Sequence, residues 1–267
     1  MIPAESRYFL DVEKSALGRP WRDRLDSAGQ GRAQAINQLH GLPTMLARVL
    51  AGRGVAPDEA PAFLDPTIRA LMPDPYALVD MEAAAIRLAD AIGRGETIAI
   101  FGDYDVDGAC SAALLGGFLE QCGVPYVIHI PDRITEGYGP NVEAIRALAK
   151  EGAALLVTVD CGVTSFEPLA EARRLGLDAI VLDHHQAPEH LPEAVIVNPN
   201  RQDDLSGLGQ LCAAGVVFMA LAAVTRLLRQ RGFFGAARPA PDLLAGLDLV
   251  ALATVADVAP LTGLNRA

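Results

Sequence analysis

The chain has 267 residues and a formal net charge of −11, from 22 basic and 33 acidic side chains. This length suits one large domain or two smaller ones, and the acidic balance disfavours nonspecific coating of nucleic acid, although it allows a local basic groove. No run of about 18 uncharged apolar residues is present, which argues against a membrane-spanning helix. The opening segment "MIPAESRYFLDVEK" lacks the basic and apolar parts of a signal peptide, and four scattered cysteines without CxxC spacing favour a reduced, cytoplasmic compartment.

Residues 1–80 are expected to form a helical, loop-rich lead. The segment "QAINQLHGLPTMLARVLAGRGV" (residues 34–55) has apolar residues at helical spacing and ends at Gly52 and Gly54, so it predicts one helix. The next segment, "APDEAPAFLDPTIRALMPDPY" (residues 56–76), is rich in proline, which predicts short helices joined by turns.

Residues 81–267 show a different pattern, in which a helix at 81–95 is followed by alternating strands and helices. Short apolar runs predict strands at residues 97–102, 125–131, 154–160, 178–183 and 193–199. Longer segments predict helices at residues 109–122, 141–152, 166–176, 211–231 and 242–257. This alternation predicts an α/β domain with a parallel sheet covered by helices on both faces.

Acidic residues and a histidine pair follow three of these strands. In open α/β sheets, ligands bind at the carboxyl ends of the strands. Each residue alone has an ordinary interpretation, as a turn, a helix cap or a solvated loop. Their arrival together at one edge favours a metal site; the residues are Asp103, Asp105, Asp107, Asp160, Asp183, His184 and His185.

The motif "DYDVDG" (residues 103–108) begins like an EF-hand calcium loop, but the twelfth residue from Asp103 is Leu114 where that loop needs a glutamate. Its flanks, a strand and an apolar helix, also differ from an EF-hand. Mixed carboxylate and imidazole ligands suit manganese, or magnesium with manganese at the histidine-bearing position. Two such ions bridged by one carboxylate activate water for phosphoryl displacement. Gly108 would let the chain turn sharply into the next helix.

Four motifs together extend this interpretation: "DYDVDG", "VTVDCGVTS", "VLDHHQ" and "ATVADV" resemble, in order, the motifs of the DHH superfamily of phosphoesterases. Flanking segments such as "PDRITEGYGPN" and "VNPNRQDD" are similar to the RecJ exonuclease branch, over roughly residue 40 to the end of the chain. The resemblance implies a DHH phosphoesterase domain that hydrolyses single-stranded DNA from 5′ to 3′ in repair and recombination. It also implies, as partners, a helicase and a single-strand-binding protein.

The resemblance implies a role for each acidic residue of the first two motifs. Asp105 and Asp107 would bind different metal ions, and Asp103 would be a ligand or support one. Asp160 would bridge the two ions.

The later motifs supply the rest of the implied site. His184 would be a metal ligand, and His185 a ligand or a phosphate contact. Asp183 would orient the histidine pair, and Asp257 would complete the ligand set. The implied catalytic set is Asp105, Asp107, Asp160, His184 and His185.

The segment "RITEGYGPN" offers candidate substrate contacts in Arg133, Tyr138 and Asn141, although a plain loop is an equally good interpretation for each alone. The sequence departs from the superfamily at Phe101, where many members have a metal-binding histidine, which implies a weaker hold on one ion. RecJ-like proteins continue into a DHH-associated domain and an OB-fold, which are not expected in these residues. The alternatives are a phosphodiesterase for short oligonucleotides, cyclic dinucleotides or pyrophosphate, and a truncated, non-catalytic nucleic-acid-binding module.

Overall fold

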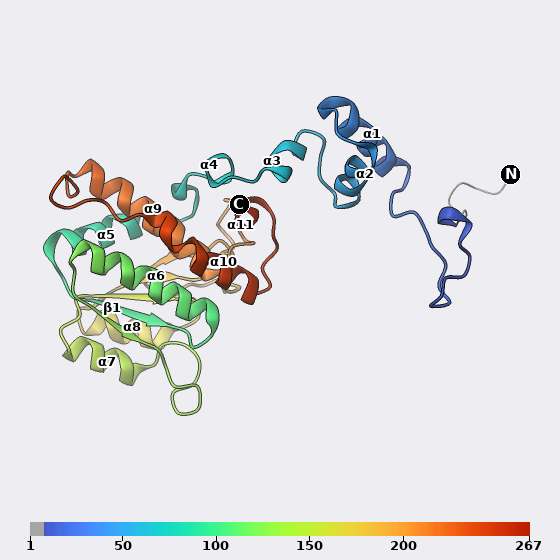
Figure 1. Cartoon of the computed structure of the whole chain (residues 1–267). Coiled ribbons are helices and arrows are strands. Elements are labelled where there is room, and N and C mark those ends of the chain that lie inside the picture. The colour runs from blue at the N-terminus through green and yellow to red at the C-terminus, as the bar shows by residue number, and fades with distance from the viewer. Residues whose placement is uncertain (1–7) are drawn as a thin grey trace. The chain divides into compact units, whose positions relative to one another are not determined.

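The computed structural model describes residues 8–267, which form two compact units (Figure 1). Unit 1 contains residues up to Met72 together with Arg266 and Ala267, and unit 2 runs from Pro73 to Asn265. The first seven residues lie outside the described residues. They are half of the opening segment in which no signal peptide is expected.

Unit 1 is helical. Its elements are the 3-10 turn η2 (Phe9–Asp11) and the helices α1 (Ser27–His40), α2 (Thr44–Gly52), α3 (Ala60–Leu64) and α4 (Ile68–Leu71). The last two confirm the short helices predicted in the proline-rich segment. The core between α1 and α2 contains Ile36, Ala47 and Leu50, all almost fully buried.

The prediction of one helix over residues 34–55 is wrong, because α1 and α2 are separate helices. Gly41 ends α1 in the left-handed conformation, with φ +63°, which a glycine adopts without strain. Pro43 then precedes α2, and its missing N–H prevents a continuous helix through this position. The helical spacing continues across the break, so periodicity alone does not reveal it.

Unit 2 contains a five-stranded sheet with the order β2-β1-β3-β4-β5, and every neighbouring pair is parallel. The strands are β1 (Ile98–Gly102), β2 (Tyr126–His129), β3 (Leu155–Val159), β4 (Asp178–Leu182) and β5 (Val195–Val197). All residues of the neighbouring strands β1 and β3 are buried, as expected for strands covered on both faces. The predicted parallel α/β fold is therefore confirmed.

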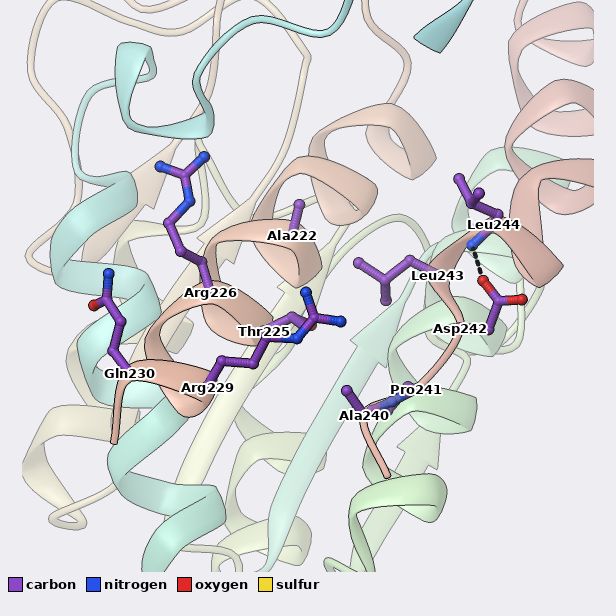
Figure 2. A pocket seen from close by; sticks show the side chains of 10 residues that line it. All are labelled: Ala222, Thr225, Arg226, Arg229, Gln230, Ala240, Pro241, Asp242, Leu243 and Leu244. Atoms are coloured by element: carbon purple, nitrogen blue, oxygen red, sulfur yellow. Dashed lines mark hydrogen bonds between the residues drawn. The ribbon is translucent and has the colours of Figure 1, made fainter. Parts of the chain in front are cut away.

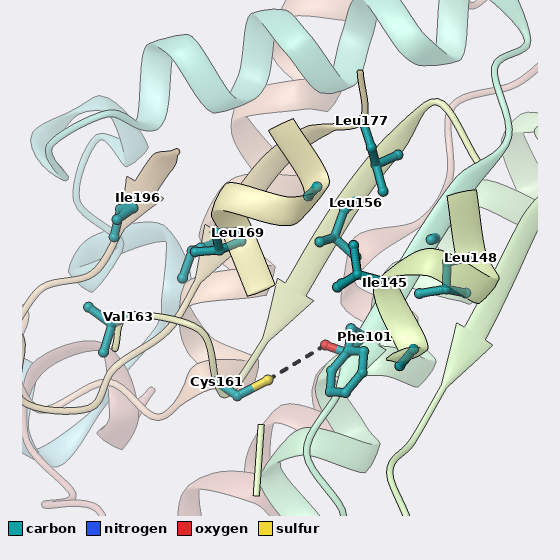
Figure 3. Packing of buried hydrophobic residues seen from close by; sticks show 13 residues of the cluster. Phe101, Ile145, Leu148, Leu156, Cys161, Val163, Leu169, Leu177 and Ile196 are labelled. Carbon is teal, nitrogen blue, oxygen red and sulfur yellow. Dashed lines mark hydrogen bonds between the residues drawn. The ribbon is translucent and has the colours of Figure 1, made fainter. Parts of the chain in front are cut away.

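Helices cover the two faces of the sheet (Figure 1). One face carries α5 (Met81–Arg94), α6 (Val106–Cys122) and α9 (Ala213–Gln230), and the other carries α7 (Val142–Lys150) and α8 (Phe166–Arg174). The second layer buries Ile145, Leu148 and Leu169 against apolar side chains of the sheet (Figure 3). The 3-10 turn η3 (Pro75–Ala77) precedes α5, and the short helix α11 (Gly263–Arg266) lies near the end of the chain.

One helix of the described residues, α9, is long and apolar enough to pass a length and composition test for a membrane span. In the structure, 72% of this segment is buried inside the protein, where it packs against α5, α6 and the sheet. It therefore occupies the position of a core helix.

The helix predicted over residues 242–257 is also two elements, the 3-10 turn η4 (Leu243–Gly246) and α10 (Leu247–Ala256). Gly246 lies where they meet, and a Cβ atom there would be 2.7 Å from a methyl carbon of Leu114 on α6. The glycine thus allows close contact with α6, on which α10 then packs.

Candidate metal centre

The parallel register collects polar side chains at one edge of the sheet. Gly102, Val159, Leu182 and Val197 pair in sequence across four strands, so the residues that follow them leave the sheet side by side. Each of those residues is polar and at most 4% exposed: Asp103, Asp160, Asp183 and Asn198. Three of them are predicted site residues, and this edge is where ligands bind in such sheets.

The turn from β1 into α6 places two further aspartates. Asp105 caps α6, because its Oδ1 atom accepts a hydrogen bond from the Gly108 N–H at 2.9 Å. The buried Asp107 carboxylate faces the start of α9 and accepts hydrogen bonds from the N–H groups of Ala213 (2.7 Å) and Ala214 (2.8 Å). The positive end of the α9 dipole thus stabilises this charge.

Asp183 holds the backbone and one ring of the histidine pair. Its Oδ1 atom accepts hydrogen bonds from the His184 N–H (2.8 Å), the His185 N–H (3.1 Å) and the His185 ring at Nδ1 (2.8 Å). Its Oδ2 atom accepts from the Val163 N–H at 3.0 Å. These bonds outweigh burial, and the pKa of Asp183 stays below its ordinary value. Because Nδ1 of His185 donates to Asp183, Nε2 is the free nitrogen of the neutral ring.

His184 lies among three carboxylates that come from different parts of the chain. Its Nε2 atom is 3.2 Å from Asp160 Oδ1 and 3.7 Å from Asp107 Oδ2, while its Nδ1 atom is 3.9 Å from Asp257 Oδ2. Burial alone would lower the pKa of His184, but the Asp160 carboxylate and its acidic neighbours raise it to about 9.

The environment of the carboxylates disfavours their charged forms. Burial raises the pKa values of Asp103 and Asp107 above their ordinary value. Burial, with the charges of Asp107 and Asp105, raises the pKa of Asp160 to about 8, despite the opposing effect of His184. A bound divalent cation would favour the charged form of all three carboxyl groups.

Unpartnered oxygens provide a test of whether a cation fits. Asp160 Oδ2 and Asp103 Oδ1 are buried without a hydrogen-bond partner among the described residues, and Asp160 Oδ1 has only the ion-pair contacts with the two histidines. A buried carboxylate is costly unless it is paired or bound to metal. Three groups could each hold an ion, with ligand atoms within 4.8 Å of one another: Asp160/His184/His185, Asp107/His184/Asp257 and Asp103/Asp105/Asp160. Asp160 belongs to two of the groups, so these donors fit more than one cation bridged by Asp160.

Of the predicted substrate residues, Tyr138 contacts this centre directly, and Arg133 lies near it only through the ring of Tyr104. The Tyr138 hydroxyl donates to the Asp160 backbone carbonyl (3.3 Å) and lies 3.4 Å from Nδ1 of His185. The Arg133 guanidinium lies 5.2 Å from the centre of the Tyr104 ring, whose edge meets the Tyr138 ring.

The side chain of Asn141, the third predicted substrate residue, makes hydrogen bonds within its own loop and helix. Its Oδ1 atom caps α7 by accepting from the Ala144 N–H at 2.8 Å, and its Nδ2 group donates to Glu136. No contact with the acidic cluster is present for this side chain in the described part of the chain.

Phe101 does not point toward the carboxylates. It is fully buried in the cluster beneath α7 and α8, where its ring stacks on His129 with the centroids 5.0 Å apart. Figure 3 shows it beside Cys161, whose thiol donates to the Phe101 carbonyl at 3.8 Å. This position therefore contributes to the core.

Several residues of the centre are not found by sequence reasoning. Asn198 and Asn200 donate to the carbonyl groups of the histidine pair, and the N–H groups of Ala213 and Ala214 bind Asp107. The asparagines stand in the segment "VNPN" directly after β5, so their place after a buried strand was the available signal. Nothing in the sequence pairs residue 107 with residue 213.

A cavity of about 730 Å³ elsewhere in unit 2 is separate from this centre. Figure 2 shows its lining of side chains from the second half of α9, among them Arg226 and Arg229, and from residues 240–244. Asp107 contacts the opposite end of α9, and the cavity contains no residue of the acidic cluster.

A model of the DHH family, N-terminal domain, matches residues 97–254, which is more than half of the chain. The chain belongs to the DHH family. The matched range contains Asp103, Asp160 and the motif "DHH" itself, residues 183–185.

Individual relatives of this DHH-family chain are similar over most of its length. It is 34% identical over 251 residues to the "Single-stranded-DNA-specific exonuclease RecJ" of Bacillus subtilis, covering 94% of this chain and 29% of that protein. The Escherichia coli K12 protein of the same name is 38% identical, over 84% of this chain and 39% of its own length. The crystal structure of Thermus thermophilus RecJ in complex with Mn²⁺ superposes with a TM-score of 0.69 at 31% identity, covering 88% of this chain and 32% of that one. The chain thus spans about a third of the length of these relatives.

Proposed function

We propose that this chain forms the metal-binding catalytic part of a phosphodiesterase that degrades single-stranded DNA from its 5′ end. The observation that carries the proposal is the buried Asp160, whose Oδ2 atom has no hydrogen-bond partner among the described residues and which belongs to two of the three candidate ligand groups. The names of the RecJ relatives, and the Mn²⁺ in the Thermus thermophilus structure, support the substrate and the cofactor.

The cofactor would be two ions of Mn²⁺ or Mg²⁺. When bound, such a pair activates water and neutralises the charge that develops on a phosphate during displacement. The donors that would hold the ions are Asp103, Asp105, Asp107, Asp160, His184 and Asp257, with Asp160 shared between the ions.

The remaining residues orient the ligands and the substrate. Asp183 fixes the histidine pair, and the free Nε2 of His185 would bind an ion or contact the scissile phosphate. Arg133 would bind a phosphate of the strand, and the rings of Tyr104 and Tyr138 offer faces on which bases can stack. The substrate contact of Asn141 stays a prediction. In the structure its Oδ1 atom caps α7.

The cytoplasmic location and the partners, a helicase and a single-strand-binding protein, also stay proposals. The location rests on the four scattered cysteines, and the partners rest on the resemblance to RecJ, whose named substrate is single-stranded DNA.

The test compares the chain with Asp160→Asn for nucleotide release from 5′-labelled single-stranded DNA in Mn²⁺. We expect release by the chain and at least a 100-fold lower rate for the variant, since loss of an outer ligand support alone costs about 10–100-fold. Asp178→Asn is the matched control, because Asp178 lies at the start of β4, at the opposite end of this strand from Asp183. It should retain the activity of the unchanged chain.

A panel of short oligonucleotides, cyclic dinucleotides and pyrophosphate in the same assay separates the alternatives. Faster turnover of one of these than of single-stranded DNA would overturn the proposed substrate. Titration calorimetry with Mn²⁺ should show binding that Asp160→Asn removes. A chain that neither binds Mn²⁺ nor releases nucleotides would refute the metal-dependent function.

A further inference from the structure

A turn that follows β5 holds the carbonyl groups of the histidine pair, whose N–H groups donate to Asp183. Asn198 is fully buried, and its Nδ2 group donates to the His185 carbonyl at 2.9 Å. Asn200, two residues later, donates from Nδ2 to the His184 carbonyl. Two side-chain amides of one turn therefore bind the two consecutive carbonyls of the histidine pair.

These bonds complete the hydrogen bonding of the pair's backbone. Asp183 accepts from both N–H groups, and the two asparagines donate to both carbonyl groups. The segment after β4 has no helix or strand of its own at His184 and His185, so side chains replace the usual backbone partners. The position of the histidine backbone is consequently set by three side chains.

The two asparagines are themselves held in place. Asn198 Oδ1 accepts from the Asn200 N–H at 2.7 Å, which fixes the turn. Asn200 also lies against Gly209, where a Cβ atom would be 2.7 Å from its Oδ1. The turn ends at Arg201, which binds Asp80 at 2.6 Å at the start of α5.

The chemistry of the contacts requires an amide at both positions. A carbonyl needs a donor, and an aspartate of the same shape would present only acceptor oxygens to it. Serine and threonine side chains are shorter and do not reach the same point. Asn198 thus donates to a carbonyl and accepts from the turn at once, and Asn200 donates through its Nδ2 group.

We propose that Asn198 and Asn200 are positioning residues that hold the His184–His185 backbone in the geometry needed for metal binding. This inference rests on the proposed function, because it assigns the histidine pair to the metal centre. Both asparagines donate to backbone carbonyl groups of the pair, so they act on the metal donors through the backbone.

The experiment measures Mn²⁺ affinity by calorimetry on the full chain, the Asn198→Ala variant and the Asn200→Ala variant. We expect the dissociation constant to rise about 10–100-fold in each variant, the usual effect of losing a residue that orients metal ligands. Asn37→Ala is the matched control, because Asn37 donates in the same way to a backbone carbonyl, that of Leu42 at 2.6 Å, but belongs to unit 1. Its Mn²⁺ affinity should equal that of the unchanged chain.

A second measurement does not depend on metal. Amide hydrogen exchange at His184 and His185 in the metal-free chain should become at least tenfold faster in both variants and stay unchanged in Asn37→Ala. A general structural role predicts the opposite combination, a lower melting temperature with the same Mn²⁺ affinity in the folded protein. If Asn198→Ala does not fold, Asn200→Ala decides, because Asn200 is only partly buried.

The outcomes separate this inference from the proposed function. Unchanged Mn²⁺ affinity in the asparagine variants, with normal binding by the parent chain, overturns only the positioning role. Absence of Mn²⁺ binding by the parent chain overturns both. Weaker binding together with faster exchange at the histidine pair supports the inference.

Discussion

Replacing Asp183 by asparagine should destabilise the protein strongly, although the side chain keeps its shape. The carboxylate is fully buried and accepts four hydrogen bonds, three at Oδ1 and one at Oδ2. An asparagine has a single acceptor oxygen. If that oxygen serves the histidine pair, the new NH₂ group faces the Val163 N–H, and two donors then meet.

The size of the effect follows from these contacts. The Val163 N–H becomes a buried donor without an acceptor, which costs about 1–3 kcal/mol, and the bonds to the remaining oxygen lose the contribution of the charge, about 1 kcal/mol each. Relief from burying a charge offsets part of this loss. We therefore expect the free energy of unfolding to fall by about 2–4 kcal/mol, which lowers the melting temperature by roughly 5–15 °C in a unit of this size.

Thermal unfolding of the metal-free chain and of Asp183→Asn measures this difference. Asp132→Asn is the control, since Asp132 also accepts three hydrogen bonds at Oδ1 but lies exposed in a loop. The control should melt at the temperature of the unchanged chain. The pKa of His185, raised by its hydrogen bond to Asp183, should also fall in the Asp183→Asn variant, as measured by NMR titration. A melting temperature within about 2 °C of the unchanged chain would contradict the assigned hydrogen bonding.

Two further predictions concern the aspartate turn and the pH dependence. Gly108→Ala should abolish tight Mn²⁺ binding and lower the melting temperature, because a Cβ atom at this position would lie 2.5 Å from the Asp103 carbonyl oxygen. Gly117→Ala is the control, since Gly117 lies in the same helix with open space around it, and it should change neither quantity. Equal Mn²⁺ affinity in the two variants would disprove the tight turn. The metal-free chain should lose stability as the pH rises from about 4 to 9. Folding raises the pKa of Asp160 from 3.8 to about 8 and that of His184 from 6.5 to about 9. Over this pH range the folded state therefore holds protons that the unfolded state releases. Mn²⁺ affinity should increase over the same range, since its ligands must lose those protons, and a flat calorimetric profile between about pH 6 and 9 would contradict this assignment.

The sequence predicts the elements of unit 2 well, because buried parallel strands are continuous apolar runs and amphipathic helices have a distinct period. It also predicts which aspartates follow a strand, since Asp103, Asp160 and Asp183 each stand directly after an apolar run. The sequence does not reveal the helix breaks, because the apolar spacing continues through Gly41 and through Gly246. The break at Gly41 depends on its left-handed backbone conformation, and the one at Gly246 lies where the chain comes close to Leu114.

Only the tertiary structure shows which of these residues meet. The strand order, with β1 between β2 and β3, brings residue 103 beside residue 160, and nothing in the local pattern encodes that order. The contact of Asp107 with the start of α9 joins residues more than 100 positions apart. Asn198 likewise resembles an ordinary turn residue until the register aligns it with Asp183. Local patterns follow from short-range sterics and burial, whereas the partners of a buried polar group depend on how the whole chain closes around it.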